Sequence, residues 1–241
     1  MLGRFLEYTI ATPDIRASLD FYGRLGFTQA EVGEAWRHPY AVVTDGRLSL
    51  GLHEQSWPAP SLTFVKPELL RHLGALEGLG FELEFHHLGN DVFNELGLLD
   101  PGGHLIRLVE ARTFSPSKRL ATDTSLCGYF LEFGLPAPQR EAAKRFWERL
   151  GFVGLDEDDA PLPQIALTSD SVNLGLFEPA HLRAPTLLFD AGDVAGALAR
   201  LAEAGITPAG QVPPPLRHSP AAALTAPEGT CILLLSADSA A

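Results

Sequence analysis

The eight histidines are the side chains of this chain best suited to chemistry, because an imidazole titrates near neutral pH and also binds metal ions. Two of them, His53 and His86, fall at the ends of expected strands. Such a pair can hold a metal ion or orient a ligand, but two histidines without a third ligand also fit surface or capping roles. The two cysteines, Cys127 and Cys231, are too few for a disulfide scaffold or a thiolate zinc site, so we expect free thiols.

Other catalytic signatures are missing from the sequence. The glycines mark turns and form no phosphate-binding loop, and no serine-centred nucleophile elbow occurs. A net charge of −12, from 18 basic and 30 acidic residues, disfavours a nucleic-acid partner. No apolar stretch reaches the roughly 20 residues of a membrane helix, and the N-terminus lacks a signal-peptide pattern. We therefore expect a cytoplasmic protein with a small-molecule partner.

An internal repeat positions these residues. Residues 3–27 and 128–152 align without a gap at an offset of 125, and eleven of the 25 positions are identical. Weaker matches continue to the end of each copy, which is how a duplicated domain looks in sequence. We expect a first domain over residues 1–111, a polar linker over 112–125 and a second domain over 126–238.

Within the first copy, the apolar spacing predicts a strand over Phe5–Ala11 and then a helix that Pro13 and Asp14 open and Gly26 ends. A hairpin follows, turning at Asp45-Gly46. The pattern then recurs within the same copy, with strands at Ser61–Val65, Phe81–His86 and Leu105–Val109 around a helix at Glu68–Leu79. The order is βαβββ twice per copy, and two such units can curl into a cupped sheet with helices outside.

The helix endings FYGRLGF and FWERLGF, at residues 21–27 and 146–152, and the turn DPGGH at residues 100–104 resemble the vicinal oxygen chelate superfamily. Its members include glyoxalases, extradiol dioxygenases and bleomycin-resistance proteins. The resemblance implies an α+β fold of two tandem glyoxalase-like domains. Each would be a pair of βαβββ units that form a cupped mixed sheet with helices outside.

In metal-dependent members, His, His or Gln, and Glu side chains bind a divalent ion from three strands of the cup and leave positions open for substrate. At these three ligand positions, the resemblance places Glu7, Ser61 and Arg107 in the first copy and Glu132, Thr186 and Leu233 in the second. Neither set supplies three ligands, and a guanidinium repels a cation. We therefore expect no metal and no other cofactor, although a divalent metal at shifted positions stays possible.

The same correspondence suggests that Glu7 and Arg107 form an ion pair in the first cup. The pair is either purely structural or grips a polar ligand. Glu132 has no countercharge at the corresponding positions of the second cup. Either another residue pairs with it, or burial raises its pKa and makes it a candidate general acid or base.

The first cup is expected to be the more polar of the two. The polar residues Thr9, His53, Thr63 and Arg107 of the first copy correspond to Gly134, Phe177, Leu188 and Leu233 of the second. We expect the first cup, or the groove between domains, to bind a small, partly apolar organic molecule without a metal, as in bleomycin-binding relatives. The predicted ligand-binding residues are Glu7, Thr9, His53, Ser61, Thr63, Arg107 and Glu132. Loop residues Trp36 and Trp57 either stack on the ligand or seal the junction between the halves.

Two alternatives stay open. One is a metal-dependent lyase, isomerase or dioxygenase that uses shifted ligands such as Glu7, His53 and His86. The other is a degenerate structural or regulatory module. We assign no catalytic residue from the sequence, and the chain is expected to be a monomer with pseudo-dimeric halves or a homodimer.

Overall fold

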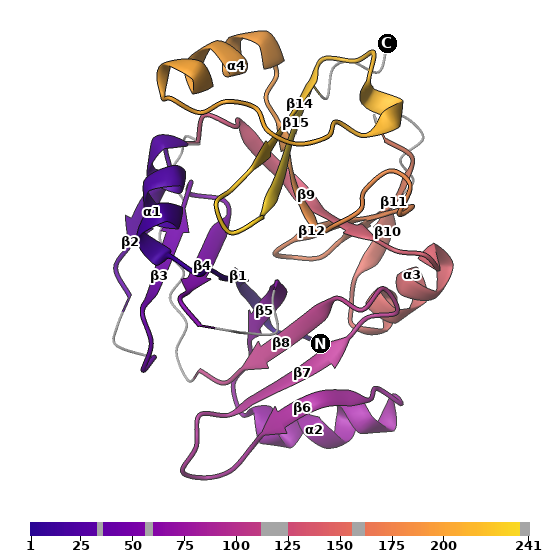
Figure 1. Cartoon of the computed structure of the whole chain (residues 1–241). Helices are drawn as coiled ribbons and strands as arrows, with labels where there is room; N and C mark the ends of the chain where they lie inside the picture. The colour runs from indigo at the N-terminus through magenta and orange to yellow at the C-terminus, as the bar shows by residue number, and fades with distance from the viewer. Residues whose placement is uncertain (33–35, 56–59, 112–124, 156–161, 237–241) are drawn as a thin grey trace.

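The computed structural model describes residues 1–32, 36–55, 60–111, 125–155 and 162–236. Within these residues the chain forms two mixed β-sheets and four α-helices in two similar halves (Figure 1). The strands of the first sheet lie within residues 4–109 and those of the second within residues 129–235. The α+β fold of two similar domains is therefore confirmed. The predicted linker, apart from Ser125, lies outside the described residues.

The first half contains eight strands and two helices. They are β1 (Arg4–Ala11), α1 (Ile15–Arg24), β2 (Thr28–Ala30), β3 (Tyr40–Thr44), β4 (Ser49–His53), β5 (Ser61–Val65), α2 (Leu69–Gly78), β6 (Leu83–His87), β7 (Glu95–Leu99) and β8 (Leu105–Val109). The order across the sheet is β2-β3-β4-β1-β5-β8-β7-β6. The first strands of the two units, β1 and β5, meet antiparallel at the centre, and each pairs in parallel with the last strand of its own unit.

The second half repeats this plan with one strand fewer. It contains β9 (Tyr129–Pro136), α3 (Arg140–Arg149), β10 (Val153–Leu155), β11 (Gln164–Thr168), β12 (Asn173–Phe177), β13 (Thr186–Asp190), α4 (Val194–Glu203), β14 (Ala221–Thr225) and β15 (Cys231–Leu235). The order is β10-β11-β12-β9-β13-β15-β14. The central strands of the two sheets are thus arranged alike, and the sheets differ at one edge, where the second has no strand equivalent to β6.

The prediction of a fourth βαβββ unit is wrong for one strand, the one expected directly after α4. After α4, the described chain forms a short 3-10 helix, Pro214–Leu216, where the first half has β6. Three consecutive prolines, residues 213–215, occupy this segment. Proline has no N–H to donate to a β-ladder, so the segment cannot pair with β14 as β6 pairs with β7.

The start of α1 follows the sequence prediction. The Asp14 carboxylate accepts hydrogen bonds from the backbone N–H groups of Arg16 and Ala17, at 3.0 and 3.1 Å, and so caps the helix. Gly26, just after the helix, has φ = +91°, a conformation that glycine adopts without strain. Each of the four α-helices has ten residues, which is too short to cross a membrane.

The larger of two apolar clusters of the described residues lies between the helices and the sheets and continues from one half to the other. The rings of Tyr8 and Phe133, on equivalent strands, have centroids 5.0 Å apart. Two equivalent hydrogen bonds also cross between the halves. The Tyr22 hydroxyl donates to Glu228 at 2.7 Å, and Trp147 Nε1 donates to Asp100 at 3.1 Å. These contacts place α1 beside the β14–β15 hairpin, as Figure 1 shows.

Candidate functional site

The polar side chains of the first sheet gather on the face opposite its helices, which we call the first cup. Strand pairing places Glu7, Thr63 and Arg107 in one row across β1, β5 and β8. Thr9 and Ser61 form the neighbouring row, and His53 ends β4 beside β1. All six residues are buried. The structure therefore brings together six of the seven predicted ligand-binding residues, and the seventh, Glu132, lies in the second half.

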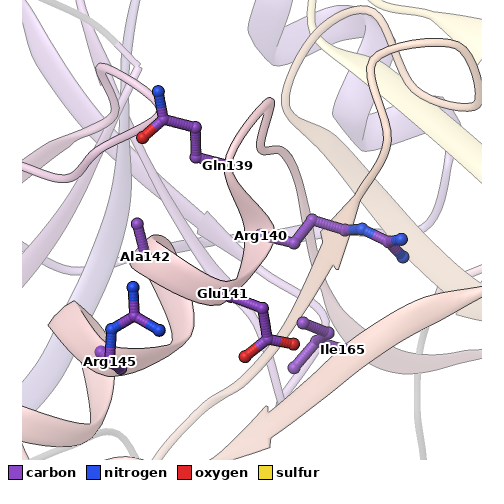
Figure 2. Close-up of a pocket in the computed structure, with 6 residues that line it drawn as sticks. All are labelled: Gln139, Arg140, Glu141, Ala142, Arg145 and Ile165. Atoms are coloured by element: carbon purple, nitrogen blue, oxygen red, sulfur yellow. The ribbon is translucent and has the colours of Figure 1, made fainter.

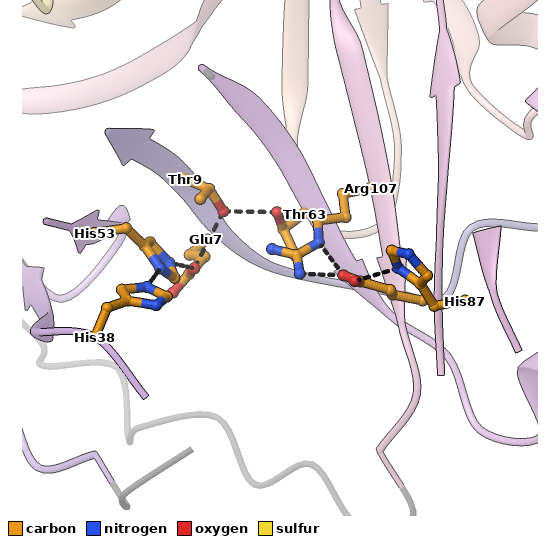
Figure 3. Close-up of polar contacts among 8 residues, drawn as sticks. Glu7, Thr9, His38, His53, Thr63, His87 and Arg107 are labelled. Carbon is orange, nitrogen blue, oxygen red and sulfur yellow. Dashed lines mark hydrogen bonds and ion pairs between the residues drawn. The ribbon is translucent and has the colours of Figure 1, made fainter. Parts of the chain in front are cut away.

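Glu7 is the centre of a hydrogen-bond network in this cup (Figure 3). The Tyr40 hydroxyl donates to Glu7 Oε2 at 2.6 Å, and the Thr9 hydroxyl donates to Oε1 at 3.1 Å. Burial, together with the carboxylate, raises the pKa of Tyr40, so Tyr40 keeps its proton as a donor. The carboxylate lies directly over Gly51, where an added Cβ atom would be 2.2 Å from Oε1. Glycine at this position therefore makes room for the acid.

Two histidines extend the network away from Glu7. His53 Nε2 lies 3.5 Å from Glu7 Oε1, and His53 Nδ1 lies 2.8 Å from His38 Nε2. In the tautomer in which His53 donates from Nε2 to Glu7, His53 Nδ1 accepts a hydrogen bond from the Nε2–H of His38. Burial first, and then His53 and Arg107, lower the pKa of His38. A neutral His38 at the outer end of such a chain is able to accept a proton from a bound molecule.

Tyr40 and His38 were not among the ligand-binding residues predicted from the sequence. A signal was present, because His38 and Tyr40 alternate with outward residues just before and at the start of β3, which pairs antiparallel with β4. In that register Tyr40 lies opposite His53. Since alternating residues share a face, both side chains had to fall on the same side as His53.

Arg107 pairs with a carboxylate other than the predicted one. Its Nε donates to Glu95 Oε2 at 2.9 Å, and its terminal nitrogen NH2 contacts the same oxygen. Glu95 Oε1 in turn lies 3.0 Å from His87 Nδ1. The predicted Glu7–Arg107 ion pair is therefore wrong. The two residues are two strands apart, about 10 Å, and each turns to a partner on its own side of the row.

The position of His86 is also corrected. β6 has a bulge between Leu83 and Phe85, so Phe85 and His87 face the first cup opposite Gly97 and Glu95. His86 lies opposite the buried Leu96 on the other face of the sheet, and it is exposed. An inserted residue reverses which face every later side chain occupies. A metal site that combines Glu7, His53 and His86 is therefore ruled out by position.

Aromatic rings cover the polar residues of the first cup. The Arg107 guanidinium lies over the ring of Trp36, 5.0 Å from its centroid. Trp36 also contacts His53 and Phe93, with centroid separations of 5.2 and 5.6 Å. The side chain of Phe93 is exposed. Trp57, the other tryptophan predicted near the cup, lies outside the described residues.

Ser61 and Thr63 have different hydrogen-bond environments. The Thr63 and Thr9 hydroxyl oxygens are 2.7 Å apart, so Thr63 belongs to the network of Glu7. The Ser61 hydroxyl is buried and has no hydrogen-bond partner among the described residues. A buried hydroxyl without a partner costs about 1–3 kcal/mol. A ligand group that hydrogen-bonds to Ser61 would remove this cost.

The corresponding face of the second sheet, the second cup, is largely filled by its own side chains. A separate apolar cluster occupies it and consists of Leu162, Phe177, Leu182, Leu188, Leu216, Leu233 and Leu235. An added Cβ at Gly134 would lie 2.6 Å from Leu188 and 2.7 Å from Leu182. Glu132 is buried here, and both it and Gln164 point to the space above Gly175. As predicted, the two cups differ in polarity.

The residues at the positions where the sequence resemblance places metal ligands do not fit a divalent ion. In the first cup they are one carboxylate (Glu7), one hydroxyl (Ser61) and one guanidinium (Arg107), and the last repels a cation. In the second cup they are Glu132, Thr186 and an aliphatic side chain, Leu233. Over the described part of the chain, no three His, Cys, Asp or Glu side chains converge in a geometry that could hold a metal.

A separate surface hollow of about 470 Å³ lies beside the first turn of α3 (Figure 2). It is lined by Gln139, Arg140, Glu141, Ala142, Arg145 and Ile165. Arg140 there pairs with Glu178 at 2.7 Å, so its charge is already balanced. Apart from the half-buried Ile165, the lining residues belong to the surface of the helix start, and the hollow is separate from both cups.

Comparison with known proteins finds similarity of fold to solved structures. No family model and no curated protein sequence matches the chain. Among solved structures, a catechol 2,3-dioxygenase matches with a TM-score of 0.60 and 15% identity, over 97% of this chain and 87% of that one. A 2,3-dioxygenase from Pseudomonas sp. KL28 matches with a TM-score of 0.60 and 12% identity, over 98% and 93%. Homoprotocatechuate 2,3-dioxygenase from Brevibacterium fuscum matches with a TM-score of 0.63 and 15% identity, over 97% and 71%.

Proposed function

Since this chain has the two-domain fold of the extradiol dioxygenases, a vicinal oxygen chelate fold, we propose that its first cup binds a small organic molecule without a metal ion. The observation that carries the proposal is the contrast between the cups. The first has buried polar groups under aromatic rings, including the unpartnered Ser61 hydroxyl. The second is filled by leucines and Phe177.

The charges in the first cup favour an uncharged ligand. Arg107 is neutralised by Glu95, and Glu7 accepts hydrogen bonds from Tyr40 and Thr9. A ligand with its own charge would have to displace one of these partners and leave a buried charge unpaired. A flat molecule with a hydroxyl or carbonyl group fits better. Its polar group would reach Ser61, and its ring would stack on Trp36.

The test is a binding screen of neutral hydroxylated aromatic compounds, read by thermal shift and by tryptophan fluorescence. Each binding compound is then measured against the variants Ser61→Ala and Thr186→Ala, which change equivalent positions of the two copies. We expect Ser61→Ala to weaken binding about tenfold, the value of one net hydrogen bond, and Thr186→Ala to leave it unchanged. Chelator should have no effect.

The proposal fails if no compound of this class binds, if Ser61→Ala and Thr186→Ala weaken binding equally, or if chelator abolishes it. Dependence on chelator would instead revive a metal-dependent lyase, isomerase or dioxygenase. Sequestration of a toxic compound, as in bleomycin-binding relatives, is one biological use that such a cup would suit.

A second candidate function is proton transfer on the bound molecule, and the chain from Glu7 through His53 to His38 favours it. A proton would leave the ligand for neutral His38 and return to another atom of the same ligand, so no oxidant or other reactant is needed. Proton exchange of a bound compound in D2O, followed by NMR, tests it. His38→Gln should abolish the exchange without abolishing binding.

A further inference from the structure

The second half has a pocket of its own at the open end of the second cup. Its volume is about 410 Å³, within the range of small-molecule sites. Two loops form its sides, at residues 180–184 and 210–217, and the first residues of β13 and β15 lie at its base. The apolar cluster that fills the rest of the second cup ends at this pocket, because Leu182, Leu233 and the adjoining Val212 belong to both.

The charge of this pocket is opposite to that of the protein. Arg183, Arg217 and His181 line it, and none of the described residues around it is acidic. The whole chain has a net charge of −12. Both arginines are exposed, and neither forms an ion pair with a described residue. Two cations on facing loops without acidic neighbours produce a locally positive potential, which attracts anions.

A buried polar atom in the same pocket lacks a partner. His181 Nδ1 is inaccessible to solvent and makes no hydrogen bond with any described residue. The Thr186 hydroxyl donates to the Ala184 carbonyl at 2.9 Å and keeps its lone pairs free to accept. The remaining surface is apolar, and Pro213 and Pro214 stiffen one side. The pocket therefore combines cations at its rim with an apolar base.

We propose that this pocket binds a small organic carboxylate, with the carboxylate between Arg183 and Arg217 and an apolar body against Leu182, Val212 and Leu233. A planar guanidinium matches a carboxylate with two parallel hydrogen bonds. The apolar lining from Leu182, Val212 and Leu233 favours an organic acid over an inorganic anion such as phosphate. This site is independent of the first cup, because the two lie in different halves and prefer ligands of different charge.

The test uses benzoate as probe, with benzamide as its neutral counterpart and inorganic phosphate as an anion without an apolar body. Isothermal titration should show saturable binding of benzoate and much weaker binding of the other two. Arg183→Ala and Arg217→Ala should each weaken benzoate binding about tenfold, and the double variant should abolish it. Because both side chains are exposed, these variants should keep the fold, which circular dichroism checks.

Two controls separate this site from the others. Arg140→Ala removes an arginine beside a different hollow, and Ser61→Ala changes the first cup; both should leave benzoate binding unchanged. Arg183→Lys with Arg217→Lys keeps the charge and should bind benzoate at intermediate strength. The proposal is overturned if benzamide or phosphate binds as well as benzoate, if benzoate does not bind, or if the double alanine variant retains binding.

Discussion

Glu7 and Arg107 lie in the same row of the first sheet, with Thr63 between them, and yet each side chain pairs away from the other. Glu7 accepts a hydrogen bond from Tyr40 on one side, and Arg107 pairs with Glu95 on the other. Arg107 is thus paired with a charge other than Glu7, and Glu7 is held by a neutral donor. The centre of the row, between these two side chains, is the hydroxyl of Thr63.

The fit of the Glu7 carboxylate over Gly51 gives a first prediction. Gly51→Ala should destabilise the protein by about 2 kcal/mol, because the new methyl group overlaps the carboxylate. The free energy of urea unfolding measures this. Gly74→Ala is the matched control, since an added Cβ there meets nothing within 4 Å in helix α2, and it should stabilise by about 0.5–1 kcal/mol.

A double-mutant cycle makes the same prediction specific. Where Glu7→Ala has already removed the carboxylate, Gly51→Ala should cost much less than it does in the natural chain. An equal cost in both backgrounds would show that the clash is with the backbone and not with Glu7.

Arg107→Leu should destabilise the protein by about 3 kcal/mol, because it leaves Glu95 in a largely buried site without its cation. Arg107→Leu combined with Glu95→Leu should recover part of that loss, since no unpaired charge remains. Chemical unfolding of the three proteins gives the values. A double variant that is no more stable than Arg107→Leu would mean that packing against Trp36, and not charge, dominates.

The lowered pKa of His38 predicts how stability depends on pH. The unfolded chain takes up a proton on His38 near the ordinary value of 6.5, whereas the folded chain does so only at lower pH. The contribution of His38 is therefore present above pH 6.5 and is lost as the pH falls through its folded pKa. Unfolding free energies of the natural protein and His38→Gln, measured across this window, should converge toward the acid side.

A constant difference between these two proteins at every pH would contradict this prediction. His86→Gln is the control, since the His86 side chain is exposed on the face of the sheet opposite the first cup. NMR titration of the His38 ring gives the pKa directly and shows whether Glu7→Gln changes it.

The two cysteines should differ in reactivity. Burial raises the pKa of the Cys127 thiol to about 12, so almost no reactive thiolate forms at neutral pH. Cys231 is only half-buried and lines the pocket of the second half. A colorimetric thiol reagent should therefore label Cys231 in the folded protein and Cys127 only after denaturation. Rapid labelling of folded Cys231→Ser would contradict this assignment.

The hydrogen bond between Tyr22 and Glu228 should contribute to holding the halves together. Tyr22→Phe removes only the hydroxyl and should destabilise by about 1–3 kcal/mol, because the Glu228 carboxylate loses one of its three hydroxyl donors and keeps those of Ser18 and Thr230. Tyr129→Phe is the control, since the Tyr129 side chain is exposed. Equal effects of the two substitutions on the unfolding free energy would show that this bond across the halves is not stabilising.

Several features of this protein follow from the sequence itself. The repeat predicts two similar halves, and the alternation of side chains along β1, β5 and β8 assigns Glu7, Thr63 and Arg107 to the same face of one sheet. The contrast between a polar and an apolar cup follows in the same way. These features are encoded locally, because side chains alternate with a period of two along any strand and equivalent segments fold alike.

Only the tertiary structure decided which of these side chains meet. The bulge in β6 places His87 and not His86 on the face of the first cup. Glu7 and Arg107 lie two strands apart, which keeps their side chains from pairing. Loops supplied Arg183 and Arg217 to the pocket of the second half, with no periodic pattern that marks them in the sequence. Strand register, loop path and side-chain direction depend on contacts between residues far apart in the chain, and a strand pattern read along the sequence does not contain them.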